Sequence, residues 1–190
     1  MKLSKKKKSD LLFWIGFGLI LAFLYLTPWG VATRTWIGGL FLSSPNMNKY
    51  KSSDNFLSAD WNIQDINNEK MWLSDTDKPI FINIWATWCG PCRTELPSIN
   101  SLYEKYEKDV EFILVSPNES IKILKEFAKD NNYKLPIYTA IGQTPSQLQT
   151  NSYPTTIIID KNKIITHKMK GAHDWNTEEV YSILNELINK

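Results

Sequence analysis

The chain has 190 residues, of which 43% are hydrophobic, and 22 Lys and Arg oppose 20 Asp and Glu for a formal net charge of +2. This length allows one globular domain with appendages, and the hydrophobic content excludes wholesale disorder. Two cysteines exclude a disulfide-rich scaffold and a four-cysteine zinc site.

The positive charge is concentrated at the amino terminus. Residues 1–10 contain five Lys and one Asp, which leaves 17 basic and 19 acidic side chains in the rest of the chain. The body therefore has no basic excess with which to neutralise phosphates, and we expect no nucleic acid partner.

An uncharged apolar run follows this basic end and continues to Val31. About 20 apolar residues span a bilayer, so the run predicts one transmembrane anchor over residues 11–31. Trp14, Tyr25 and Trp29 lie near its ends, as interfacial anchors do. The positive-inside rule assigns residues 1–10 to the cytoplasm. We therefore expect a single-pass protein of the cell membrane, with the catalytic domain on the extracytoplasmic (periplasmic) side.

Two other interpretations of this run remain open. A cleaved signal peptide has a shorter apolar region and small residues at the cleavage site, for which residues 30–32 are a weak match. A buried core helix fits poorly beside five Lys. After the anchor, residues 32–59 are predicted to be a linker, because the part from Ser43 onward is rich in Ser, Asn, Lys and Asp.

Residues 60–190 are predicted to form one domain of alternating strands and helices. In chain order, the patterns predict a hairpin over 61–73, a strand over 79–86, a helix over 91–108, a strand over 110–115, a helix opened by a capping box at 116–119, a strand over 135–139, a polar loop over 142–152, strands over 155–160 and 163–169, and a last helix opened at 176–179. This order indicates a three-layer α/β domain.

The sharpest chemical signal is Cys89-Gly90-Pro91-Cys92, placed where an apolar strand ends and a helix begins. Two sulfurs at this spacing can close a disulfide across one helical turn. The helix amino terminus favours a thiolate on the first sulfur, since unpaired N–H groups and a partial positive charge lie there. Cys89 is then the nucleophile, and Cys92 resolves the mixed disulfide.

Three other interpretations of the cysteine pair are weaker. A zinc site would need His167 and His173 as further ligands, and surface positions without a role are expected for both. The second interpretation is a structural disulfide without a redox role. A peroxidatic cysteine is the third, but the Thr or Ser and the Pro that such a site needs are replaced by Ala86 and Ile82.

The segment 83–97 resembles the active-site stretch of the thioredoxin superfamily, in particular that of the membrane-tethered TlpA/ResA-like thiol–disulfide oxidoreductases. Pro97 matches the proline that kinks the active-site helix, and Tyr153-Pro154-Thr155-Thr156 matches the loop with a cis proline. The resemblance covers residues 60–190, including an extra helix and strand that this branch usually carries. It implies a thioredoxin-like fold with a central mixed sheet.

The resemblance also implies roles for single residues. A cis Pro154 faces the disulfide, and the backbone of Tyr153 pairs with an extended substrate. Trp88, Gly90 and Pro91 belong to the same substrate-binding surface.

Two polar positions of the same stretch concern proton transfer. Asn83 replaces the buried Asp of thioredoxin, which leaves Glu95 as the candidate group for proton transfer to Cys92. A solvated glutamate is the alternative for Glu95. Trp85 is expected in the core and Arg93 in solvent.

The predicted function is reduction of disulfides in an extracytoplasmic protein, such as the haem-attachment cysteines of an apocytochrome c. The Gly-Pro dipeptide favours a reductant. The resemblance implies a membrane electron donor that re-reduces the pair, and neither a metal nor another cofactor is expected. A disulfide oxidase or isomerase on the same scaffold, or a tethered binding module with a structural disulfide, are the alternatives.

Overall fold

The computed structural model describes residues 5–52, 54–131 and 133–190. The chain divides into two compact units, Met1–Phe41 and Leu42–Lys190. Each unit is described by itself.

The described part of the first unit, from Lys5 to Phe41, forms the helices α1 (Lys5–Leu26) and α2 (Pro28–Gly39). The predicted single helix over residues 11–31 is therefore interrupted, because Pro28 has no N–H with which to continue α1. Thr27 instead caps α2, and its side-chain oxygen accepts a hydrogen bond from the N–H of Gly30 at 3.0 Å. Within the described residues, no helix is both long and apolar enough to cross a membrane.

The second unit is built on one seven-stranded mixed sheet. Its strands are β1 (Asn62–Asp65), β2 (Lys70–Trp72), β3 (Ile80–Ile84), β4 (Glu111–Val115), β5 (Ile137–Ile141), β6 (Thr155–Ile159) and β7 (Ile165–Lys170), in the spatial order β2-β1-β5-β4-β3-β6-β7. Strands β3, β4 and β5 run parallel, and the other pairs are antiparallel. The mixed sheet and the α/β class agree with the prediction.

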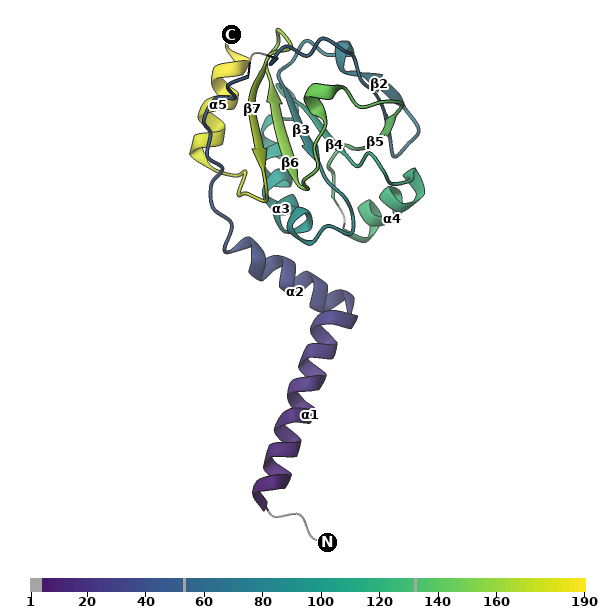
Figure 1. Ribbon diagram of the computed structural model, residues 1–190, viewed down its shortest axis with the longest axis vertical. Helices are drawn as coiled ribbons and strands as arrows, with labels where there is room; N and C mark the ends of the chain where they lie inside the picture. The colour runs from purple at the N-terminus through teal and green to yellow at the C-terminus, as the bar shows by residue number, and fades with distance from the viewer. Residues whose placement is uncertain (1–4, 53, 132) are drawn as a thin grey trace. The chain divides into compact units, whose positions relative to one another are not determined.

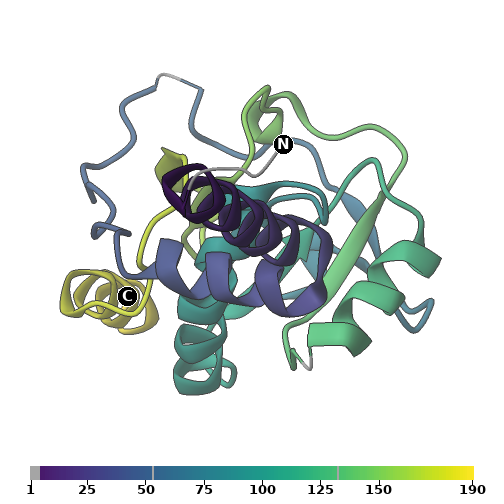
Figure 2. The same ribbon diagram turned by 90° about the horizontal axis from the view of Figure 1, so that it is seen from below.

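Three helices pack on one face of this sheet. They are α3 (Gly90–Tyr106), α4 (Ile121–Asn131) and α5 (Glu178–Ile188), and they lie across the sheet in the order α5, α3, α4 (Figures 1 and 2). Their buried side chains join one core cluster with Phe81 of β3. Ile82 points to the opposite face, because successive strand residues alternate between faces.

On the other face of the sheet, the described residues form loops and short turns and no long helix. Two 3-10 turns, η1 (Leu73–Asp75) and η2 (Ser146–Leu148), contribute Leu73 and Leu148 to the second core cluster, and Leu57 and Trp61 join them. The third layer of the domain is therefore made of loops and turns. The predicted loop over residues 142–152 contains η2 as its one helical turn.

The segment 42–58 belongs to this second unit, although the sequence predicted it to be part of a linker. It runs along the edge strand β7: Tyr50 N–H donates to Thr166 O at 2.7 Å, and Ile165 N–H donates to Asn55 O at 2.7 Å. Met47 is buried in the first core cluster and Leu57 in the second. We name residues 42–58 the edge segment. Its polar composition gave no indication of this backbone pairing with β7.

Candidate active site

The two cysteines lie at the start of α3, directly after the buried strand β3. Cys89 is the N-cap residue of the helix, and the Cys92 N–H points at its sulfur at 3.2 Å. The two sulfurs are joined in a disulfide, with Cα atoms 5.3 Å apart. The exposed fraction is 5% for Cys89 and 0% for Cys92. A thiolate that attacks this disulfide would therefore reach the Cys89 sulfur first.

A groove of about 470 Å³ opens in front of the disulfide. Trp88 stands on its rim with 73% of its surface exposed, and its ring centre lies 6.0 Å from that of Tyr153. Cys92 does not line this groove. We name it the redox groove, and its walls are Trp88, Cys89, Gly90, Pro91, Thr150, Asn151 and Tyr153.

The loop before β6 forms the far wall of the redox groove. The Tyr153–Pro154 peptide bond is cis, as predicted. Of the five residues predicted to bind substrate, Trp88, Gly90, Pro91 and Tyr153 line the redox groove, and Pro154, the next residue along the chain, is buried. Their role in substrate binding stays a prediction.

Glu95 is fully buried one helical turn after Cys92, so the alternative of a solvated glutamate is wrong. Its carboxylate accepts three hydrogen bonds, from Asn83 Nδ2 at 2.8 Å, Trp175 Nε1 at 2.9 Å and His173 N at 3.1 Å. Burial raises the pKa of Glu95 to about 7, and the hydrogen bonds from Trp175, Asn83 and His173 oppose this rise. A carboxyl group with this pKa can hold or release a proton near neutral pH.

Glu119 fixes the loop that carries Trp88. One carboxylate oxygen accepts hydrogen bonds from Thr87 N at 2.8 Å and from Ser116 Oγ at 2.7 Å, and the other accepts from Thr87 Oγ1 at 2.5 Å. The sequence indicated only a local capping box here, but α4 begins later, at Ile121. Glu119 therefore joins the loop after β4 to the loop before α3.

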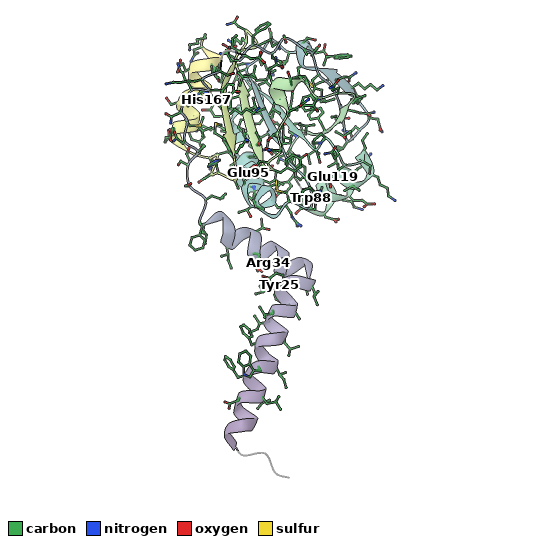
Figure 3. The ribbon with its side chains drawn as sticks, in the orientation of Figure 1. Tyr25, Arg34, Trp88, Glu95, Glu119 and His167 are labelled. Carbon is green, nitrogen blue, oxygen red and sulfur yellow. A yellow bond between two sulfur atoms is a disulfide. The ribbon has the colours of Figure 1, made fainter. Side chains whose placement is uncertain are left out.

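Figure 3 places Trp88, Glu95 and Glu119 toward one end of the domain, away from His167. His167 is 3% exposed on β7, so the expected surface position is wrong for this residue. Within residues 5–52, 54–131 and 133–190, no cluster of His, Cys, Asp and Glu could hold a metal ion. The zinc interpretation therefore has no support in this part of the chain.

Two further expectations concern side chains around α3. Trp85 is fully buried, as predicted. Arg93 was expected in solvent but is half-buried, with its guanidinium 5.6 Å from the centre of the Phe127 ring. No sequence pattern indicated a role for Trp175, which reaches Glu95 from 80 residues away.

Comparison with known sequences identifies relatives over most of the chain. The AhpC/TSA family matches residues 57–168. The thiol–disulfide oxidoreductase ResA of Bacillus thuringiensis subsp. konkukian is 33% identical over 180 residues, covering 92% of this chain and 96% of the relative. A ResA of Bacillus cereus is 34% identical over 180 residues with the same coverage.

Solved structures show the same fold. A Bacteroides vulgatus protein assigned to the thiol–disulfide oxidoreductases superposes with a TM-score of 0.58 and 27% identity, covering 72% of this chain and 99% of that one. StoA from Bacillus subtilis gives a TM-score of 0.53 with 18% identity, over 70% of this chain and 97% of StoA. At that identity the likeness to StoA concerns the fold alone.

Proposed function

Since the chain belongs to the AhpC/TSA family and is a thiol–disulfide oxidoreductase homologous to ResA, we propose that it reduces disulfides in extracytoplasmic client proteins. The observation that carries this proposal is the unequal exposure of the two sulfurs. Cys89 faces the redox groove, whereas Cys92 lies behind it. This arrangement suits one attacking and one resolving thiol.

The reaction is two successive thiol–disulfide exchanges. The Cys89 thiolate attacks one sulfur of the client disulfide, that bond breaks, and the departing client thiolate takes up a proton. Cys92, deprotonated, then attacks the Cys89 sulfur and releases the second client thiol. Two electrons pass to the client, and the Cys89–Cys92 disulfide remains.

The direction of electron flow is inferred from the dipeptide between the cysteines. Gly90-Pro91 is the thioredoxin type, and thioredoxin has a potential near about −270 mV, against about −120 mV for the oxidant DsbA. A reductant in an oxidising compartment must be re-reduced. We assign this step to a membrane protein that supplies electrons, and the haem-attachment cysteines of an apocytochrome c are a fitting client.

Membrane attachment through the amino-terminal region is part of this proposal. Four of the five Lys of residues 1–10 belong to α1, and the apolar side chains of this helix from Leu11 to Leu26 are largely exposed. An exposed apolar surface of this kind is expected to be buried in a lipid bilayer or against a partner protein. Attachment to a bilayer would also bring the active site close to a membrane electron donor. Membrane fractionation of the tagged full chain tests the attachment. A tag at residue 1 that is digested from the outside of intact cells would overturn the proposed orientation.

Two cysteine substitutions test the catalytic roles. Cys89→Ser should abolish disulfide reduction, whereas Cys92→Ser should accumulate clients as mixed disulfides with Cys89, because the resolving thiol is absent. Non-reducing gel analysis of cell extracts shows these adducts. A Cys92→Ser variant that forms none, or a Cys89→Ser variant with full activity, would contradict the proposal and favour a structural disulfide.

A further inference from the structure

A second groove adjoins the redox groove at the loop before β6. It has a volume of about 600 Å³ and shares Thr150 and Asn151 with the redox groove. We name it the lysine groove, and its walls are Tyr50, Gln149, Thr150, Asn151, Lys168 and Lys170. The lysine groove therefore lies next to the place where a polypeptide bound at Cys89 would run.

The two lysines are placed beside the cis-proline loop by the register of the sheet. Lys170 pairs with Thr155, the residue directly after Pro154, and Gly171 N–H donates to Pro154 O at 2.9 Å. Lys168 lies two residues earlier on β7, so its side chain points to the same face as that of Lys170. The ammonium groups of Lys168 and Lys170, both on the edge strand β7, therefore line the lysine groove.

These positive charges are not compensated within the grooves. Among the described residues, those that line the two grooves include no Asp or Glu. Burial and the neighbouring Lys170 ammonium both lower the pKa of Lys168. The Lys168 ammonium donates to Gln147 O at 2.8 Å and to Gln149 O at 3.3 Å, which uses two of its three N–H groups and fixes its position.

From this arrangement we infer that the lysine groove binds the residues that flank the client disulfide, and that it selects polypeptides with Asp or Glu at those flanking positions. The inference rests on the proposed thiol–disulfide exchange and adds the class of substrate to it. Carboxylates in the groove would relieve the repulsion between the two lysines. The contacts lie partly in solvent, so their main effect is on encounter and orientation, and salt should weaken them.

Two matched peptides test the inference with the full chain in detergent. Each peptide has one intramolecular disulfide, flanked on both sides by Glu in the first and by Gln in the second. At low ionic strength we expect exchange with the Glu peptide to be about threefold to tenfold faster, after each rate is divided by that with free dithiothreitol. The preference should shrink as salt increases.

Charge reversal at the lysine groove should reverse this preference. Lys170 is exposed, so Lys170→Glu reverses the charge without disturbing a packed side chain, and Lys170→Gln should give an intermediate ratio. Lys70→Glu is the matched control, since Lys70 is exposed on β2 at the opposite edge of the sheet. The control should keep the wild-type ratio.

Exchange is followed in both directions, with reduced protein on oxidised peptide and with oxidised protein on reduced peptide. Equal normalised rates for the two peptides, or an equal loss of preference in Lys70→Glu and Lys170→Glu, would overturn the lysine groove while leaving the exchange chemistry intact. Both directions pass through the same mixed disulfide, so the groove should favour the Glu peptide in both. Exchange that proceeds only when the protein oxidises the peptide, with the Glu preference retained, would support the groove and overturn the reductase direction. No exchange in either direction would overturn both.

Discussion

The buried carboxyl group of Glu95 couples the folding free energy to pH. Its pKa of about 7 in the folded chain lies above the ordinary value of 4.5, because burial disfavours the charge. As pH rises from about 4.5 to 7, the unfolded chain loses this proton while the folded chain retains it. The free energy of unfolding should therefore fall by about 3 kcal/mol over this range and level off above it.

Replacing the carboxyl group by a neutral amide should remove this contribution. In Glu95→Gln the proton is absent at every pH, so the decrease between pH 4.5 and 7 should disappear. Urea unfolding of residues 42–190 with the disulfide intact, at several pH values, measures it. Glu104→Gln is the control, since Glu104 is exposed on the same helix and should leave the decrease in place. An unchanged pH dependence in Glu95→Gln would assign it to another group.

Glu119 gives a second prediction at the scale of one residue. Glu119→Ala leaves the N–H of Thr87 and the hydroxyl groups of Thr87 and Ser116 without their acceptor. We expect a loss of about 1–3 kcal/mol in the free energy of unfolding and faster hydrogen exchange at the Thr87 amide. Glu126→Ala, an exposed position on α4, should change neither quantity. Slow exchange at Thr87 in the Glu119 variant would show that the loop is held by other contacts.

At the scale of elements, the order of apolar and polar residues along the chain predicted the helices and strands, because interactions between neighbouring residues largely decide these elements. The apolar run over 79–86 predicted the buried strand β3, and the predicted hairpin, helices and later strands appear with ends shifted by a few residues. Contacts between distant residues were not accessible in this way. The carboxylate of Glu119 binds Thr87, 32 residues earlier, and Trp175 reaches Glu95 across 80 residues. No pattern of neighbouring residues records such a contact.

The edge segment shows the same limit and leads to a prediction about fragments. Its polar composition suggested a linker ending at residue 59, yet Met47 and Leu57 are buried and the backbone pairs with β7. A fragment of residues 60–190 should therefore unfold about 3–5 kcal/mol more easily than one of residues 42–190, because two apolar side chains and these hydrogen bonds are lost. Urea unfolding of both fragments measures the difference. Equal stability would mean that the edge segment contributes nothing to the fold.

At the scale of the whole molecule, the stability of the two redox forms reports the direction of electron flow. A thermodynamic cycle links the difference in unfolding free energy between the oxidised and reduced forms to the stability of the disulfide in the folded chain. DsbA is a strong oxidant because its reduced form is the more stable one. In a reductant, the oxidised form must be more stable than the reduced form.

We therefore expect the oxidised form of residues 42–190 to be the more stable one. Closing the short loop between Cys89 and Cys92 contributes about 2 kcal/mol through the entropy of the unfolded chain. Each 1.4 kcal/mol of extra stability in the oxidised form lowers the reduction potential by about 30 mV. Parallel urea titrations with and without dithiothreitol measure the difference, and a Cys89→Ser/Cys92→Ser double variant corrects for any effect of the reductant itself. A reduced form more stable than the oxidised one would make the protein a disulfide donor, and the electrons would then flow from client to protein.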